Sequence, residues 1–200
     1  MNFKVFLNGE EYHGFIDASS CYVLACDGGY KYCEKRGINV DAVIGDFDSL
    51  GFVPDKALIF PKEKDFTDGE AAVDFALKKG EIKEIEFYNF GGKREDHFLG
   101  NLAVLAKGYR LGFNVKAYTN YSQIYYTENE ITLCGVKGKT ISLVPFCENA
   151  NILVNEGLKY NAVGKTLNAF SSLGISNVAV EDKVFIKVKG RIFVIVNNGQ

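Results

Sequence analysis

The chain lacks several features that mark whole classes of protein. It has no run of lysines and arginines, and its formal net charge is −2. We therefore expect no nucleic-acid partner, because such partners need a broad basic surface. No apolar run is long enough to span a membrane, so we expect no membrane association. The first residues form a predicted strand and turn that are too short and too polar for a signal peptide, and we expect a cytoplasmic protein.

Common nucleotide and cysteine motifs are missing as well. Without a G-x-x-x-x-G-K-[S/T] loop the chain is no ordinary P-loop enzyme, and without G-x-G-x-x-G a dinucleotide oxidoreductase is disfavoured. The cysteines are odd in number and contain no C-x-x-C pair, which favours buried free thiols in a reducing cytoplasm. A reactive thiol at Cys26 is the alternative. The five are Cys21, Cys26, Cys33, Cys134 and Cys147.

The first 120 residues alternate between predicted strands and helices. With 200 residues, 47% of them hydrophobic, the chain can bury the core of one large or two small domains. Strands spaced by helices predict an α/β domain, residues 1–120, with a mostly parallel sheet and flanking helices. The expected strands are 3–7, 22–26, 40–44, 57–60, 84–90 and 115–118, and the expected helices are 29–36, 67–79 and 95–107.

After about residue 120 the pattern changes to short β-prone runs. They are punctuated by Gly, Asn, Glu and Lys, and no long helical pattern remains. This predicts a C-terminal antiparallel β-sandwich or barrel in residues 121–200. The expected strands are 124–127, 130–133, 140–144, 152–154, 178–180, 184–188 and 192–196.

Two carboxylates, Asp46 and Asp48, follow an apolar strand. Along an extended chain, side chains at i and i+2 point the same way, so both acids should share one small volume. The carboxyl ends of strands are where open α/β sheets bind ligands, and hard oxygen ligands at close spacing suit Mg²⁺. An ordinary acidic turn explains the pattern equally well.

Glycines and acids mark two further strand ends. Asp27-Gly28-Gly29 begins a predicted helix whose backbone N–H groups would suit a phosphate, although an ordinary βα turn explains it too. Farther along, Thr67 and Glu70 fit a capping box. Asp68 then falls in the first helical turn, and Asp65 precedes the cap.

A third candidate phosphate site follows Gly91-Gly92. Arg94, His97 and Asn101 fall at i, i+3 and i+7, on one face of the predicted helix. An Arg fork beside a glycine turn suits a phosphate, whereas His97 has open alternatives: a phosphate, a base or a strand carbonyl. Three acidic clusters and two glycine turns at strand ends together indicate Mg²⁺ and a polyphosphate.

These segments resemble the thiamine pyrophosphokinase (thiamine diphosphokinase) family, in order along most of the chain. The segments that carry the resemblance are Ala25-Cys26-Asp27-Gly28-Gly29, Gly45-Asp46-Phe47-Asp48-Ser49, Asp65-Phe66-Thr67-Asp68, Gly92-Lys93-Arg94-Glu95-Asp96-His97 with Asn101, Ser142-Leu143-Val144-Pro145, Gly157-Leu158-Lys159-Tyr160 and Ser172-Leu173-Gly174-Ile175-Ser176-Asn177.

The resemblance implies transfer of pyrophosphate from ATP to the hydroxyl of thiamine, with Mg²⁺, in a homodimer whose sites are shared between subunits. ATP and Mg²⁺ would bind the first domain, and the partner's β domain would contribute to thiamine binding. The implied catalytic residues are Asp46, Asp48, Asp68, Asp96 and Arg94, of which Asp46, Asp48 and Asp68 would hold the metal. ATP would contact Asp27, Gly28, Gly29, Thr67, Arg94, His97 and Asn101, and thiamine would contact Ser172, Ser176 and Asn177.

The sequence departs from that family pattern at two points. It has no tryptophan to stack on thiamine, which leaves Phe170, Tyr160 or another aromatic residue for that role. Asn89 stands where a leading glycine is expected in the turn before Gly91. Two other functions remain open: an aspartyl phosphatase with Asp46 as nucleophile, and a module that binds nucleotide or thiamine without turnover.

Overall fold

The structure, a computed structural model, describes residues 1–48, 50–80 and 82–199. The chain divides into two compact units, Met1–Asn120 and Tyr121–Gln200, each of which is described by itself. Within the described ranges, no helix has the length and apolar character needed to cross a membrane.

The first unit is built around a parallel sheet. Its strands lie in the order β6-β5-β1-β2-β3-β4, and each neighbouring pair is parallel. The order reverses between β1 and β5, which makes that position the switch point of the sheet. The elements are β1 (Asn2–Phe6), β2 (Cys21–Cys26), α1 (Gly29–Lys35), β3 (Ala42–Gly45), β4 (Ala57–Ile59), α2 (Asp68–Lys79), β5 (Glu84–Tyr88), α3 (Glu95–Arg110) and β6 (Asn114–Tyr118).

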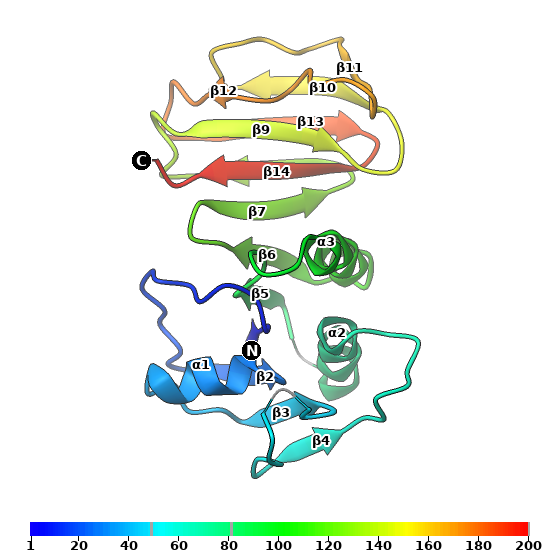
Figure 1. Ribbon diagram of the computed structural model, residues 1–200. Helices are drawn as coiled ribbons and strands as arrows, with labels where there is room; N and C mark the ends of the chain where they lie inside the picture. Colours follow the sequence, from blue (N-terminus) through cyan, green and yellow to red (C-terminus); the bar gives the residue numbers. More distant parts are fainter. Residues whose placement is uncertain (49, 81, 200) are drawn as a thin grey trace. The chain divides into compact units, whose positions relative to one another are not determined.

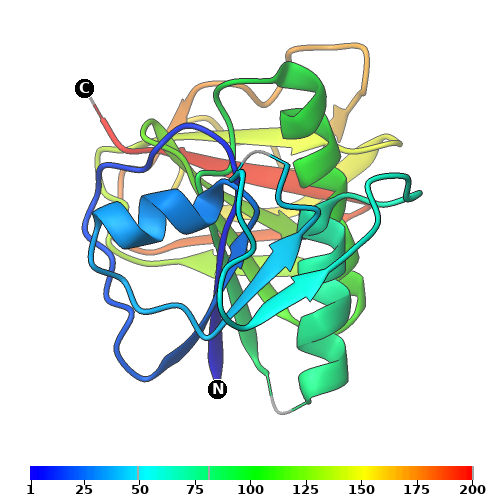
Figure 2. The same ribbon diagram turned by 60° about the horizontal axis from the view of Figure 1, so that its bottom comes forward.

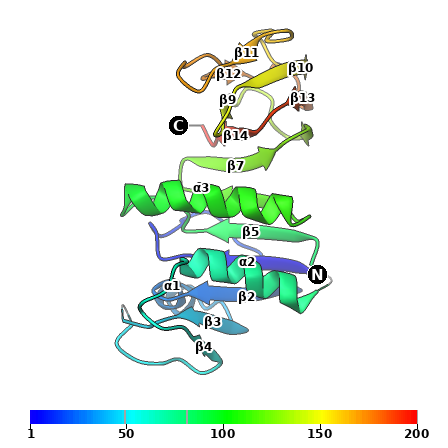
Figure 3. The ribbon, with the colours of Figure 1, turned by 90° about the vertical axis from the view of Figure 1, so that its right-hand side faces the viewer.

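Helices cover both faces of this sheet. Figure 1 shows α1 on one side of the strands and α2 and α3 on the other, and Figure 3 shows α2 and α3 side by side across one face. Alternation along β1 explains the two layers, since Phe3 packs on Phe75 of α2 and Phe6 on Tyr32 of α1. Figure 2 looks onto the β4 edge, where β3 and β4 lie between α1 and α2. The predicted α/β class is confirmed.

Several helix and strand ends differ from the sequence expectation, and those of α3 and β5 are two examples. Helix α3 continues to Arg110, and its Gly108 packs so closely that an added Cβ would lie 2.9 Å from Cγ1 of Val115. Strand β5 ends at Tyr88 because Asn89 takes a left-handed conformation with φ of 54°. Asparagine tolerates this conformation better than most residues, so it replaces the expected glycine there.

The described part of the second unit contains strands and loops without a helix, and its strands lie in two layers (Figure 1). Apolar side chains of both layers form one buried cluster. One layer has the order β12-β9-β14-β7 and the other β11-β10-β13-β8, with antiparallel pairing throughout. The predicted antiparallel sandwich is confirmed, although the two-residue strand β11 was not expected. The strands are β7 (Ser122–Thr127), β8 (Glu130–Leu133), β9 (Thr140–Pro145), β10 (Ala150–Glu156), β11 (Thr166–Leu167), β12 (Asn177–Val178), β13 (Val184–Lys189) and β14 (Ile192–Asn197).

All five cysteines are free thiols, as expected, but they are not all buried. Cys26 and Cys33 are buried, whereas Cys134 and Cys147 are exposed in loops, so the expectation of burial is wrong for those two. Burial raises the pKa of Cys26 well above its ordinary value, and this disfavours the alternative of a reactive thiol there.

Candidate active site

A cavity of about 590 Å³ opens at the carboxyl ends of the parallel strands of the first unit. It is bounded by the ends of β1, β2, β3 and β5 and by the starts of α2 and α3, and so includes the switch point of the sheet. Its lining residues are Leu7, Asn8, Gly9, Cys26, Asp27, Asp46, Asp48, Lys62, Lys64, Phe66, Thr67, Asp68, Gly69, Phe90, Gly91, Lys93, Arg94, His97, Phe98 and Asn101.

Three carboxylates converge in this cavity. Asp27, Asp46 and Asp48 each offer an oxygen, and these oxygens lie within 4.8 Å of one another. Asp27 is only 6% exposed, and its Oδ1 is buried without a hydrogen-bond partner among the described residues. A buried carboxylate oxygen without a donor is costly unless a cation or a ligand satisfies it. Three close carboxylates, one of which has an unsatisfied oxygen, fit a hard divalent cation such as Mg²⁺.

The pair Asp46 and Asp48 meets through a turn and not along an extended strand. Strand β3 ends at Gly45, and Phe47 between the two acids has φ of 61°. The Asp48 N–H donates to Oδ1 of Asp46 at 3.2 Å, which tightens this turn. The two carboxylates therefore lie together, as predicted, but a turn and not an extended strand brings them there. Ser49, the last residue of that segment, lies outside the described residues.

Asp68 lies in the cavity but outside the group of three acids. Its Oδ1 is 2.8 Å from the ammonium of Lys64, and it occupies the first turn of α2, as predicted. Burial raises the pKa of Asp68, the Lys64 charge opposes that rise, and the nearby Asp27 and Asp46 add to it. A role for Asp68 as a metal ligand stays a prediction, whereas Asp27, assigned from sequence to the nucleotide, is the third acid that the fold brings to the pair.

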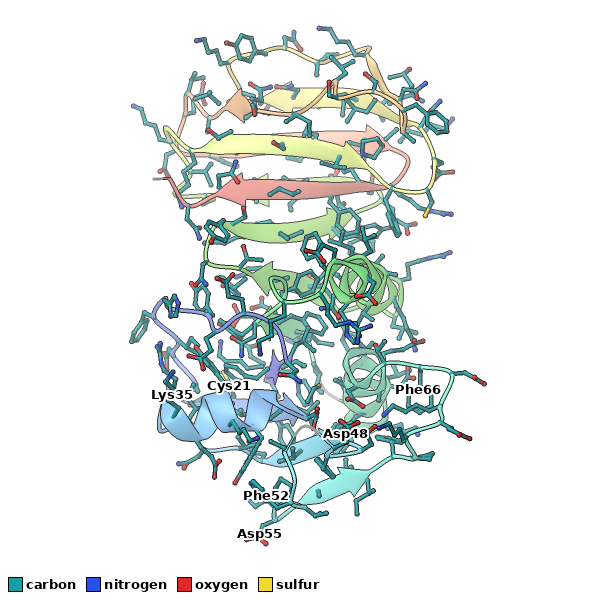
Figure 4. The ribbon with its side chains drawn as sticks, in the orientation of Figure 1. Cys21, Lys35, Asp48, Phe52, Asp55 and Phe66 are labelled. Atoms are coloured by element: carbon teal, nitrogen blue, oxygen red, sulfur yellow. The ribbon has the colours of Figure 1, made fainter. Side chains whose placement is uncertain are left out.

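Two lysines of the loop before α2 pair with acids of the cavity, and neither lysine was predicted from the sequence. Lys62 pairs with Asp48 at 2.9 Å, and Lys64 pairs with Asp68. Asp48 and Phe66 are labelled in Figure 4 and lie on the α2 side of the sheet, away from Lys35 of α1. The available signal was the segment Pro61-Lys62-Glu63-Lys64, which places two cations immediately before an acidic helix start.

The start of α2 confirms the Thr67 half of the predicted capping box, whereas the Glu70 side chain has another partner. The Thr67 hydroxyl accepts a hydrogen bond from the Glu70 N–H at 3.2 Å, and the Glu70 carboxylate pairs with Lys107 of α3. Thr67 and Gly69 line the cavity, so this helix start faces it. Asp65 is exposed and is not among the lining residues.

The start of α3 brings three predicted residues to the same cavity. Arg94, His97 and Asn101 all line it, as their shared helix face predicts. The Asn101 amide donates to the Phe90 carbonyl at 2.8 Å and so fixes the turn after β5. Arg94 makes two hydrogen bonds to the Asp96 carboxylate, which is exposed and is not a lining residue.

The glycines after Asp27 have a packing role. A Cβ at Gly28 would lie 2.3 Å from the Asn8 side chain, and one at Gly29 would lie 2.2 Å from the Phe6 carbonyl. Both glycines therefore allow the start of α1 to approach the end of β1. Gly28 lines a smaller cavity of about 270 Å³ that also includes Lys31. Contacts of these glycines with ATP stay a prediction.

The residues predicted to bind thiamine lie in the second unit. Asn177 is 8% exposed, and its side chain accepts from the Tyr160 N–H and donates to the Tyr160 carbonyl, so it fixes that loop. The Ser176 N–H donates to the Ser142 hydroxyl at 3.0 Å, and Ser172 is exposed. Phe170 is fully exposed and Tyr160 is 57% exposed, so both rings are accessible within this unit.

The first unit is an α/β domain with an acidic cavity at the switch point of its sheet, and the second is a β-sandwich. This combination defines a class of two-domain proteins with a candidate metal and phosphate site in the first domain. Two family models match the chain: "Thiamin pyrophosphokinase, catalytic domain" over residues 16–117 and "Thiamin pyrophosphokinase, vitamin B1 binding domain" over residues 123–193. The chain therefore belongs to the thiamin pyrophosphokinase family.

Relatives of known sequence and structure agree with this assignment. The thiamine pyrophosphokinase of Bacillus subtilis is 28% identical over 193 residues, which are 91% of this chain and 89% of the relative. Crystal structures of the thiamine pyrophosphokinases of Bacillus subtilis and Geobacillus thermodenitrificans superpose with TM-scores of 0.85 and 0.84, at 24% and 22% identity. Each covers 100% of this chain, and this chain covers 100% and 98% of theirs. At such identities the superpositions establish the fold.

Proposed function

We propose that the protein transfers the pyrophosphoryl group of ATP to the hydroxyl of thiamine, giving thiamine diphosphate and AMP. The observation that carries this proposal is the group of three aspartates, with its unsatisfied Asp27 oxygen, in the cavity at the switch point. Membership of the thiamin pyrophosphokinase family supports the same reaction. The reaction is a phosphoryl transfer, in which positioning and charge neutralisation account for most of the catalysis.

Magnesium is the expected cofactor. Asp46, Asp48 and Asp27 would hold it, because their oxygens lie within 4.8 Å and repel one another without a cation. A bound Mg²⁺ supplies positive charge that neutralises and orients the polyphosphate. Asp68 is the fourth aspartate that lines the cavity, and the family pattern predicts it as a metal ligand as well.

The remaining cavity residues suit the nucleotide. Lys93 and Arg94 add positive charge at the start of α3, and an Arg fork matches phosphate oxygens. His97 and Asn101 line the same wall, where contacts to ATP were predicted. The apolar lining residues, Phe66, Phe90 and Phe98, offer surfaces for a base.

The transfer itself forms one bond and breaks one. The oxygen of the thiamine hydroxyl attacks the β-phosphorus of ATP, and the bond from that phosphorus to the oxygen bridging the α-phosphorus breaks. AMP leaves with the electron pair of that bond, and the hydroxyl proton passes to a base. Asp96 is our candidate for that base or for orienting the hydroxyl, on condition that its pairing with Arg94 is released.

Thiamine binding and assembly follow from the family pattern. We propose a homodimer in which Ser172, Ser176 and Asn177 of one subunit contribute to thiamine binding at the catalytic domain of the other. Phe170 and Tyr160 are exposed aromatic side chains that suit a thiamine ring in the absence of tryptophan. A cytoplasmic location fits the two buried free thiols. A stable monomer with full activity would exclude the shared site.

The deciding experiment is a product analysis. Purified protein is mixed with ATP, Mg²⁺ and thiamine, and the nucleotides and thiamine species are resolved. We expect thiamine-dependent AMP, one for one with thiamine diphosphate. Free phosphate would indicate instead the aspartyl phosphatase with Asp46 as nucleophile, and binding without turnover would indicate a ligand-binding module.

A further inference from the structure

A lysine whose side chain is largely enclosed lines the acidic cavity. The Lys64 side chain is only 9% exposed, its ammonium lies 2.8 Å from Oδ1 of Asp68, and it also lies over the Phe60 ring at 5.9 Å. A lysine side chain is rarely this little exposed unless it is paired, because removing an ammonium from water is costly. The loop before α2 therefore holds the Lys64 side chain against Asp68 at the wall of the cavity.

Lys64 differs in burial from the other cations of the cavity. The side chain of Lys62 is 76% exposed and that of Arg94 is 65% exposed, so water and salt screen both charges. A charge in a water-poor position acts more strongly on a neighbouring ligand. Among the described cations that line the cavity, Lys64 is thus placed to attract an anionic group most strongly.

The ammonium of Lys64 has donor capacity beyond its ion pair. It carries three N–H donors, and among the described residues its carboxylate partner is Asp68. Asp68 keeps the ammonium in place, while the remaining donors suit the oxygens of a bound anion. Lysine binds phosphate as a compact point charge, which fits a polyphosphate beside the three aspartates.

We propose that Lys64 is a catalytic residue that binds the β- and γ-phosphate oxygens of ATP, with Asp68 as its positioning partner. This inference rests on the proposed pyrophosphoryl transfer, because it names a further group that contacts the transferred pyrophosphate. Neither the acidic pattern nor the glycine turns of the sequence pointed to this lysine.

The test compares two nucleotides that differ in the phosphates beyond the first. α,β-Methylene-ATP keeps those phosphates but is inert, since the bond that must break is replaced, and AMP lacks them. We expect Lys64→Met to weaken binding of α,β-methylene-ATP by about 10- to 100-fold, the range for one charge-assisted hydrogen bond, and AMP binding by less than about twofold. Calorimetry measures both constants, with and without Mg²⁺.

The matched control is Lys35→Met. Lys35 pairs with Glu11 at 2.7 Å on the exposed surface of α1 and does not line the cavity, so neither nucleotide should bind differently. A Lys64→Met effect of equal size on AMP and on the analogue would overturn the proposal, because it would indicate a general disturbance.

A second measurement avoids the risk that Lys64→Met does not fold. In the wild-type protein, the ¹⁵N resonance of the Lys64 ammonium, assigned with Lys64→Arg, should shift on addition of α,β-methylene-ATP and stay in place with AMP. An unchanged resonance with saturating analogue would overturn the proposal. Wild-type protein that binds the analogue through Lys64 but forms no AMP from ATP and thiamine would refute the proposed reaction and leave the phosphate contact standing.

Discussion

The guanidinium of Arg94 makes two hydrogen bonds to the carboxylate of Asp96, with Nε 3.1 Å from Oδ1 and Nη2 2.6 Å from Oδ2. The pair sits at the start of α3, and the His97 N–H also donates to Oδ1 at 2.9 Å. The Arg94 fork that suits a phosphate is therefore engaged by the residue that we assign to the hydroxyl. Binding of a polyphosphate to Arg94 would release the Asp96 carboxylate. Asp96 would then be free to contact the thiamine hydroxyl only when the nucleotide is bound.

The first prediction concerns the pKa of Asp96. The Arg94 hydrogen bonds, with the His97 N–H and the nearby charges, lower the pKa of Asp96 to about 2. We expect Arg94→Gln to raise it toward the ordinary value of about 3.9. Because the folded pKa is lowered, the pair contributes stability above the unfolded pKa and loses it as the pH falls toward 2. Carboxyl ¹³C NMR titration measures the shift.

Asp17 provides the internal control for this titration. Its pKa is lowered by hydrogen bonds from Ser19, far from Arg94 in sequence, and it should not move in Arg94→Gln. A wild-type Asp96 that titrates near 3.9 would show that the pair with Arg94 does not persist in solution. The same variant should lose at least about tenfold in kcat/KM for ATP, since a phosphate contact is removed.

The second prediction concerns the three aspartates. Asp46→Asn should lower turnover by more than about tenfold, which exceeds ~1.4 kcal/mol of transition-state stabilisation. Without Mg²⁺ it should melt no lower than wild type, because one of three mutually repelling carboxylates is gone. With Mg²⁺ the wild type should gain thermal stability by ligand linkage, and Asp46→Asn and Asp27→Asn should gain less.

Thermal melts with and without Mg²⁺ measure these differences. Asp41→Asn is a suitable control, because its carboxylate accepts from the Val23 N–H and does not line the cavity. The Mg²⁺-induced rise in melting temperature should be the same in Asp41→Asn as in wild type. An equal rise in Asp46→Asn would contradict the metal role of the three acids.

Local signals in the sequence predicted the elements and part of the site. The Thr67 cap, the alternation of strand and helix, and the helix face of Arg94, His97 and Asn101 depend on neighbours within one or two turns. Such patterns involve residues that are close in sequence. The structure keeps them because the local preference of each segment agrees with its tertiary packing.

The rest of the site depends on contacts between distant segments. Asp27 joins Asp46 because β2 and β3 are paired in the sheet, and periodicity does not reveal strand order. Lys64 lies in the loop between β4 and α2, and its side chain is enclosed by contacts with Phe60 and Asp68. A lysine in a loop is ordinarily expected to be exposed, so the sequence did not indicate this position. The Phe47 turn is likewise set by tertiary structure, because a β-prone aromatic residue in a left-handed conformation runs against its own propensity.

The third prediction tests the packing role of Gly29. A methyl group at Gly29 would lie 2.2 Å from the Phe6 carbonyl oxygen, a backbone atom that cannot rotate away. Gly29→Ala should lower the free energy of unfolding by about 1–3 kcal/mol. Gly100 of α3 meets nothing within 4 Å, so Gly100→Ala should raise it by about 0.5–1 kcal/mol through helix propensity. Urea unfolding measures the free energy of unfolding of both variants. An equal change in Gly29→Ala and Gly100→Ala would refute the packing role of Gly29.

The last prediction concerns a buried ion pair that the proposed reaction does not use. Lys4 of β1 and Glu86 of β5 are register partners, each under 10% exposed, and their side chains form an ion pair. The Glu86 carboxylate also accepts from Tyr88 at 3.1 Å, Tyr118 at 2.9 Å and Lys116 at 3.2 Å. Glu86→Leu should cost about 3–5 kcal/mol, because it leaves a buried ammonium uncompensated, and Lys4→Met with Glu86→Leu should cost less.

The pH dependence of this ion pair gives an independent check. Burial raises the pKa of Glu86. The hydrogen bond and charge of Lys4, together with Lys116 and Tyr118, lower it by more than burial raises it, so the pKa of Glu86 is below its ordinary value. A lowered carboxyl pKa contributes stability that is complete above the unfolded pKa of about 4.3 and is lost as the pH falls through the folded pKa. The free energy of unfolding should therefore fall more steeply below about pH 4.3 in wild type than in the double variant, as urea titrations at several pH values would measure. Parallel curves would show that Glu86 has the same pKa in the folded and unfolded chains.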